Sequence, residues 1–163
     1  GISVKESQKA VDLSPSIFDR IGEAGFLELT TLFYDRVFGD KDAPWFLDIF
    51  SSLTKNEAID NQYRFLVQTF GGPDLYKQKG KGKYTRLVGR HANYPIGRKA
   101  ADQWIRYMEA ALMDHSQLSK DDEARVTLSN YFHYTAHYIV SARPLMRPDQ
   151  LSGGTQIDKG RFW

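Results

Sequence analysis

The chain has 163 residues, a formal net charge of +2 with 26% charged residues, and no cysteine. This balanced charge gives little support to nucleic-acid binding, and the lack of cysteine excludes disulfides, a thiol nucleophile and a thiolate metal site. The length suits one domain with one core. No apolar run approaches the roughly 18 residues of a membrane span, and the first residues lack the apolar stretch of a signal peptide. We therefore expect a soluble, cytoplasmic protein with no membrane partner.

The N-terminal third of the chain opens on polar residues, and we expect Gly1–Leu13 to be a loosely held extension. Ser14-Pro15 then supplies an N-cap followed by a proline in the first turn, which predicts a short helix. Gly25 is expected to interrupt it. Apolar residues recur at helical spacing after Gly25 and predict a second helix that ends at Gly39.

The middle of the chain begins with an aromatic-rich segment, residues 43–50, which predicts a tight turn or a 3₁₀ segment that packs inward. Thr54 and Glu57 then form a capping-box pattern. This pattern predicts the start of a helix, which ends at the glycines and proline of residues 71–73. Gln62 lies within an apolar stripe of this helix, and a buried amide needs a hydrogen-bond partner.

The segment after this helix carries two glycines among lysines, so we predict a flexible loop over Asp74–Lys83. The loop leads into a short basic turn that contains His91 and breaks at Pro95. A turn this short is not stable by itself, so a packing partner or a ligand must hold it. His91 is therefore either a metal ligand or a histidine at a helix C-terminus, where a cation is favoured.

Two further helices follow Pro95, the first ending near His115 and the second capped by Ser119 and closed at Pro144. Residues 144–163 contain prolines, glycines and scattered charges, and they predict a flexible C-terminal tail. Neither an internal repeat nor a strand-period run is found, so the expected fold is all-α.

Three other histidines are candidates for a site. His133 and His137 lie four residues apart on one predicted helix, a spacing that can bind zinc, but no further ligand-rich motif accompanies them. We therefore expect surface or packing histidines at both positions. His115 sits at a helix end, where a structural role is the simpler interpretation.

The predicted elements place a histidine-bearing turn opposite a helix with a glutamine in its apolar stripe, beside an aromatic corner. A flat apolar cofactor with an axial nitrogen ligand needs such an arrangement. The residues that carry a family resemblance are, in chain order, Phe33-Tyr34, Phe65-Leu66-Val67-Gln68-Thr69-Phe70-Gly71-Gly72-Pro73, Arg90-His91-Ala92 and Trp104. In their combined spacing they resemble the group II truncated haemoglobins, and the loop composition and terminal extensions look most like the plant branch.

The resemblance covers roughly Ser14 to Ser141 and implies a globin-like fold, a truncated two-over-two helical sandwich around haem b. We accordingly divide the chain into a polar N-terminal extension (1–13), a truncated globin domain (14–143) and a flexible C-terminal tail (144–163).

The same resemblance implies the site residues. His91 is expected to bind the haem iron through Nε2. Three side chains are expected to donate hydrogen bonds to a ligand on the iron and to act as the catalytic residues, namely Tyr34, Gln62 and Trp104. The alternative for these three is a structural role as core aromatic residues and a tolerated polar residue. The remaining haem-binding residues are expected to be Phe50, Ala58, Phe65, Leu66, Tyr76 and Arg90.

Two of these residues, Arg90 and Tyr76, could reach the haem propionates. Asn61 stands where the family has another basic propionate partner. This departure from the family pattern puts the second propionate contact in doubt.

Fixed hydrogen-bond donors stabilise the negative charge on the outer oxygen of bound O₂, so the resemblance favours reaction over transport. The expected chemistry is oxidation of nitric oxide to nitrate, or cleavage of peroxide with a proton from Tyr34 or Trp104. Turnover needs an external reductase, because the chain has no flavin or nicotinamide fingerprint.

The expected partners are thus this reductase and the diatomic gases O₂, NO and CO, and a homodimer is left open. Two alternatives to an enzyme remain. The first is a sensor or buffer of O₂ or NO without sustained turnover, and the second is a haem-free helical interaction protein.

Overall fold

The computed structural model describes residues 1–78 and 97–142 of the chain. The helices in these ranges are α1 (Val4–Asp12), α2 (Ile17–Gly39), α3 (Pro44–Leu47), η1 (Asp48–Phe50), α4 (Lys55–Thr69), α5 (Leu75–Gln78), α7 (Arg98–Asp114), η3 (Leu118–Lys120) and α8 (Asp122–Ala142). The described residues contain no strand, which confirms the all-helical prediction. None of the described helices has both the length and the apolar composition of a transmembrane span.

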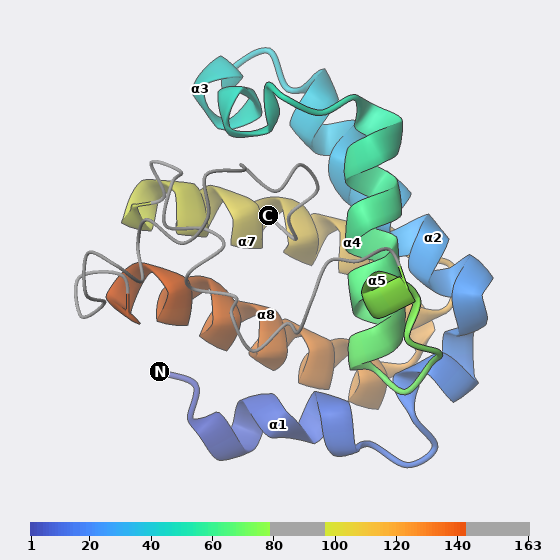
Figure 1. Cartoon of the computed structure of the whole chain (residues 1–163). Coiled ribbons are helices and arrows are strands. Elements are labelled where there is room, and N and C mark those ends of the chain that lie inside the picture. The colour runs from blue at the N-terminus through green and yellow to red at the C-terminus, as the bar shows by residue number, and fades with distance from the viewer. Residues whose placement is uncertain (79–96, 143–163) are drawn as a thin grey trace.

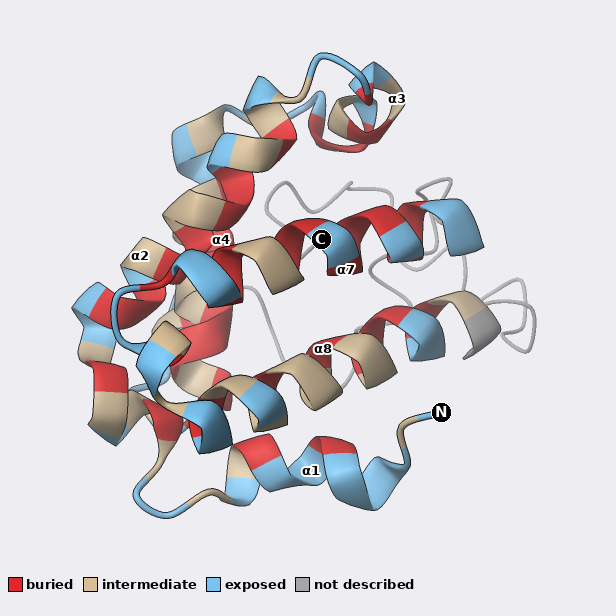
Figure 2. Cartoon of the chain, turned by 180° about the vertical axis from the view of Figure 1, so that it is seen from behind, coloured by how far each residue is buried: buried red, intermediate tan, exposed pale blue. Residues whose placement is uncertain are grey.

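The four long helices form two packed pairs, α2 with α4 and α7 with α8 (Figure 1). Helix α2 also packs on α7, so the two pairs meet and enclose one core. This is the predicted two-over-two helical sandwich. Figure 2 shows that the long helices carry both buried and exposed stretches, as amphipathic helices around a shared core do. The largest fully buried side chains are Trp104, Tyr34, Tyr76, Phe26, Phe33, Phe46, Phe65, Phe70, Phe132, Ile17, Leu29 and Leu66.

Helix α1 corrects the prediction that residues 1–13 are loosely held. Ser3 caps this helix, because its Oγ accepts a hydrogen bond from the backbone N–H of Glu6 at 3.2 Å. The Glu6 carboxylate accepts the backbone N–H of Ser3 at 2.9 Å in return. Helix α1 packs on α8 and buries Ser7 and Ala10 there (Figure 1). A reciprocal Ser-x-x-Glu cap is a sequence signal for a helix, and the polar composition obscured it.

Helix α2 breaks at Gly22 and not at Gly25, where the sequence predicted the interruption. Gly22 has a φ of 66°, which lies in the left-handed region that glycine adopts without steric cost. Gly25 lies within the helical part of α2, and a Cβ atom there would come within 2.5 Å of the Cβ of Ile21. Both glycines are therefore required, one for backbone conformation and the other for close packing.

The helix caps agree with the sequence at one position and differ at another. Thr54 caps α4, since its Oγ1 accepts the backbone N–H of Glu57 at 3.1 Å. Ser119 does not cap α8 but lies in η3. Asp121 caps α8 instead, with its Oδ1 accepting the backbone N–H of Ala124 at 3.1 Å, and the Arg20 guanidinium holds this carboxylate at 3.3 Å.

The aromatic corner and the segment after α4 both contain short helices. The predicted turn or 3₁₀ segment of residues 43–50 is confirmed as the single turn of α3 followed by η1. Within the predicted loop of residues 74–83, the first part forms the short helix α5, in which Tyr76 is fully buried. The predicted turn around His91 and the predicted tail of residues 144–163 lie outside the described residues.

Candidate functional site

Tyr34 of α2 is fully buried, with a relative exposure of 0%. Its ring lies edge-on to Phe33 at 4.9 Å and to Phe50 at 5.5 Å, measured between ring centroids. Phe50 belongs to η1, so the aromatic corner after α2 folds back over the tyrosine. Burial raises the pKa of Tyr34. The phenol therefore stays protonated and keeps its ability to donate a hydrogen bond.

Trp104 of α7 lies on the other side of Phe33. The indole ring is 5.2 Å from the Phe33 ring and 5.4 Å from the Phe132 ring of α8, and the side chain is 1% exposed. Phe33 thus contacts both Tyr34 and Trp104. Two of the three predicted donors are brought together around one phenylalanine, although they come from different helices.

Helix α4 supplies four predicted residues, and all four are buried with at most 1% exposure: Ala58, Gln62, Phe65 and Leu66. Their spacing of 4, 3 and 1 residues places them on one face of the helix. This face packs toward the interior because α4 packs on α2, the helix that carries Tyr34. Gln62 therefore adds a buried amide to the same interior.

The remaining predicted residues fall into two groups. Tyr76 of α5 is fully buried, and its ring lies edge-on to Phe65 at 5.3 Å. Asn61, which replaces a basic residue of the family pattern, is also buried, at 4% exposure. Arg90 and His91 lie outside the described residues.

The buried groups have the chemistry that a haem pocket needs. Among the described residues no Asp, Glu, Lys or Arg is buried, so the buried donors are neutral groups set among aromatic and aliphatic side chains. Such an environment suits a flat apolar macrocycle and a small neutral ligand, because neither requires a buried countercharge. The described residues therefore fit haem, and the phenol, amide and indole can donate to its ligand.

Phe33 and Tyr107 were not predicted as part of the site. Phe33 lies at the centre of the cluster, and its ring also contacts the ring of Tyr107 at 6.3 Å. Tyr107 donates a hydrogen bond from Oη to Oδ2 of Asp40 at 2.6 Å. The sequence carried a signal for Tyr107, since it lies three residues after Trp104 and thus on the same side of α7.

The described histidines play structural or surface roles, as predicted. His115 is fully buried; its Nε2 lies 2.7 Å from the Gly25 carbonyl oxygen, and its Nδ1 accepts the backbone N–H groups of Gln117 and Leu118 at 3.1 and 3.0 Å. His133 contacts a carboxylate oxygen of Glu109 through Nε2 at 3.0 Å. No group of three metal-ligating side chains occurs within the described ranges.

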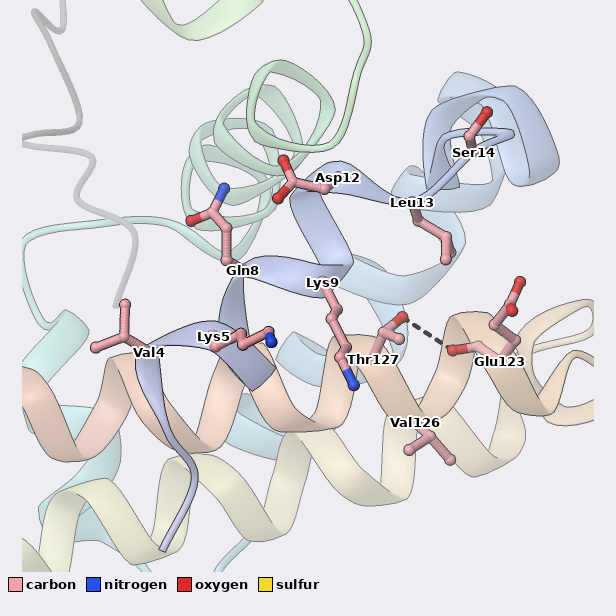
Figure 3. Close-up of a pocket in the computed structure, with 10 residues that line it drawn as sticks. All are labelled: Val4, Lys5, Gln8, Lys9, Asp12, Leu13, Ser14, Glu123, Val126 and Thr127. Carbon is pink, nitrogen blue, oxygen red and sulfur yellow. Dashed lines mark hydrogen bonds between the residues drawn. The ribbon is translucent and has the colours of Figure 1, made fainter.

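A surface groove lies away from all of these residues, between α1 and α8 (Figure 3). It has a volume of about 910 Å³, and its lining includes the apolar residues Leu13 and Val126 together with Lys5 and Lys9 of α1. None of the predicted site residues lines it. The candidate site is thus the buried aromatic cluster, and the groove is a separate feature of the surface.

The chain is similar to known proteins over most of its length. Residues 16–138 match the bacterial-like globin family. The chain is similar to two-on-two hemoglobin-3 of Arabidopsis thaliana, with 38% identity over 86% of this chain and 77% of the relative. It is also similar to group 2 truncated hemoglobin 3-1 of Lotus japonicus, with 40% identity over 77% of this chain and 72% of the relative.

A solved structure gives the same result at the level of the fold. The crystal structure of a hemoglobin from the thermophilic phototrophic bacterium Chloroflexus aurantiacus superposes with a TM-score of 0.63 and 32% identity. The match covers 77% of this chain and 97% of that protein.

Proposed function

We propose a redox function for this chain, which belongs to the bacterial-like globin family and is therefore a haem protein that binds diatomic gases. In this proposal the cofactor is haem b and His91 binds its iron through Nε2. Arg90 and Tyr76 hold the propionates, by a charge-assisted hydrogen bond and a hydroxyl respectively. The walls of the pocket are the apolar residues Phe50, Ala58, Phe65 and Leu66.

Haem b, when bound, supplies an iron that holds a diatomic ligand and exchanges electrons with it. The chain itself contributes the donors of Tyr34, Gln62 and Trp104, which stabilise a ligand that gains negative charge. The proposed reaction is oxidation of nitric oxide by O₂ to nitrate, or cleavage of peroxide with proton donation from Tyr34 or Trp104. An external reductase supplies the electrons for repeated turnover.

The observation that carries this proposal is the full burial of three neutral donors from three different helices. Tyr34 and Trp104 both contact Phe33, and burial keeps the Tyr34 phenol protonated. A hydrogen bond to a charged acceptor contributes about 1.5–3 kcal/mol. Two such bonds that are lost before the ligand leaves slow O₂ release by about 10²–10⁴-fold. Slow release disfavours transport and favours reaction within the pocket.

The first test concerns haem binding through His91. In the His91→Ala variant we expect much weaker haem retention, with partial recovery of the Soret spectrum on addition of imidazole. His137→Ala is the matched control, because His137 is an exposed histidine of α8. Equal haem affinity and an unchanged ferrous spectrum in His91→Ala would show that another group binds the iron.

The second test concerns turnover. The oxygenated protein is mixed with repeated additions of nitric oxide, in the presence of a cellular reductase fraction and its nicotinamide cofactor. Sustained consumption of nitric oxide with formation of nitrate supports the enzyme. One equivalent of oxidation followed by a persistent ferric form would overturn it and leave a sensor or buffer.

A further inference from the structure

Five aromatic rings form a closed circuit that links the proposed ligand site to the end of α2. Successive ring centroids are 4.9 Å apart from Tyr34 to Phe33, 6.3 Å from Phe33 to Tyr107, 5.3 Å from Tyr107 to Phe46, 5.6 Å from Phe46 to Phe50, and 5.5 Å from Phe50 back to Tyr34. Two routes of ring contacts therefore connect Tyr34 to Tyr107. Trp104 joins the circuit through Phe33 at 5.2 Å.

The hydroxyl of Tyr107 contacts a carboxylate. Its Oη donates to Oδ2 of Asp40 at 2.6 Å, a short charge-assisted hydrogen bond. Asp40 is half-buried at the C-terminal end of α2, and its other oxygen accepts the backbone N–H of Asp42 at 2.9 Å. The Tyr107 hydrogen bond, followed by the Asp42 hydrogen bond, lowers the pKa of Asp40. The carboxylate is therefore ionised at neutral pH and able to accept a proton.

The phenol of Tyr107 starts in its protonated form. Burial, followed by the hydrogen bond to Asp40, raises the pKa of Tyr107. Loss of one electron makes a phenol a strong acid, so a carboxylate already bonded to the hydroxyl lowers the cost of that loss. A purely structural role, in which Tyr107 links α7 to the end of α2, would explain the hydrogen bond. It would not explain the ring contacts that connect Tyr107 through Phe33 to Tyr34 and Trp104.

We propose that Tyr107 is a redox-active residue that passes electrons from a surface reductant to the haem pocket, with Asp40 as the acceptor of its phenolic proton. This inference rests on the proposed peroxide chemistry of the pocket. In the step itself hydrogen peroxide is the oxidant: Tyr107 would give up one electron toward the haem pocket, its Oη–H bond would break, and the proton would move to Oδ2 of Asp40. A one-electron reductant of the phenol or ascorbate class then returns an electron, and Asp40 returns the proton.

The balance over a full cycle is simple. One hydrogen peroxide and two reductant molecules, each of which loses one electron and one proton, give two water molecules and two one-electron-oxidised reductant molecules. The electrons pass through Tyr107, and the protons that the reductant releases to solvent replace those taken up from solvent as water forms. Tyr107 and Asp40 are restored at the end of each of the two electron transfers. The residues act as a relay, and no atom of either is consumed.

The charges around the circuit favour Tyr107 over Trp45, another oxidisable ring near this corner. Trp45 also lies beside Phe46, at 5.7 Å between ring centroids, but the Lys99 ammonium sits 4.2 Å from the centre of the Trp45 indole. A positive charge on a ring opposes removal of an electron from it, whereas the Asp40 carboxylate beside Tyr107 favours removal. Of these two rings, Tyr107 is therefore expected to lose the electron more readily.

The test uses the haem-loaded full chain, mixed with hydrogen peroxide, frozen within milliseconds and examined by electron paramagnetic resonance. Tyr107→Phe removes only the hydroxyl, and we expect it to abolish most of the tyrosyl radical signal. Asp40→Asn should slow the appearance of the radical by about 10²-fold, the lower end of what a positioned proton acceptor contributes. Tyr138→Phe is the control, because Tyr138 is 49% exposed and stacks only on Tyr134 among the described rings.

The outcomes separate this inference from the peroxide chemistry on which it rests. An unchanged signal in Tyr107→Phe, or a loss confined to Tyr138→Phe, would overturn the relay. If the haem spectrum of the parent does not respond to peroxide, the peroxide chemistry fails instead. In that case photo-oxidised tris(bipyridine)ruthenium, which needs no haem, still decides about Tyr107. The relay is supported if part of the radical signal is lost in Tyr107→Phe and appears more slowly in Asp40→Asn. It is refuted if that signal appears at the same rate in Asp40→Asn as in the parent.

Discussion

His115 and Tyr34 are both fully buried polar side chains, but their surroundings differ. The two ring nitrogens of His115 contact backbone groups, the Gly25 carbonyl on one side and the N–H groups of residues 117 and 118 on the other. The ring of Tyr34 is instead enclosed by the rings of Phe33 and Phe50. Burial of a polar group is thus no sign of function by itself. Backbone partners indicate a structural role, whereas aromatic walls shared with another donor suit a ligand.

The largest expected effect belongs to the structural member of this pair. His115→Ala removes the contact to Gly25 and leaves two backbone N–H groups without their acceptor, of which that of Leu118 is buried and that of Gln117 is partly buried. This loss should lower the free energy of unfolding by about 3 kcal/mol. Urea unfolding of the haem-loaded protein, followed by circular dichroism, measures this loss. The O₂ dissociation rate should stay within about twofold of the parent's, since His115 is no part of the pocket. A large change in the O₂ dissociation rate with little loss of stability would contradict the structural role of His115.

In the buried aromatic cluster we expect a smaller change in free energy but a clear change in the O₂ dissociation rate. Trp104→Phe removes the indole N–H, and Gln62→Leu in the same variant prevents the amide from replacing it. We expect the double variant to release O₂ about tenfold faster than Gln62→Leu alone, which corresponds to roughly 1.4 kcal/mol. Stopped-flow replacement of O₂ by carbon monoxide gives the rate. A ratio within about twofold would mean that Trp104 is only a wall of the pocket.

The smallest expected effect is that of removing the negative charge of Glu28, whose carboxylate lies beside His115. Glu28 accepts both the backbone N–H and the hydroxyl of Ser116, at 2.8 and 2.7 Å, and its carboxylate lies 3.3 Å from Nε2 of His115. Glu28→Gln keeps the shape but loses the charge. At pH 7 it should cost about 1 kcal/mol, the difference between charged and neutral hydrogen bonds.

The pH dependence of this difference has a definite sign. Burial acts to raise the pKa of Glu28, but the Ser116 hydrogen bonds and His115 outweigh it and lower the pKa from its usual value of 4.5. Because the folded pKa lies below the unfolded one, the carboxylate stabilises the fold above the unfolded pKa. This stabilisation is lost as pH falls through the folded pKa. Unfolding curves of parent and variant should therefore converge in acid, and a gap that widens there would contradict the assignment.

Local sequence signals were sufficient for most of the fold. Apolar periodicity predicted the long helices, and the Thr54 cap and the aromatic corner appear as expected because each depends on residues close together in the chain. The errors have the same local origin. The Ser3-x-x-Glu6 cap was hidden by a polar segment, and the break in α2 was assigned to Gly25 because spacing alone does not tell a glycine with positive φ from one required by packing.

The sequence by itself determined an all-helical chain of globin type, and it supplied the prediction of which residues bear the chemistry of the site. It could do so because helical periodicity, caps and motif order are properties of neighbouring or ordered residues. Tertiary structure alone decided that Phe33 joins Tyr34 to Trp104, that Tyr107 of α7 meets Asp40 at the end of α2, and that His115 bonds to Gly25. The last two contacts span 67 and 90 residues, and such contacts form only when whole helices pack.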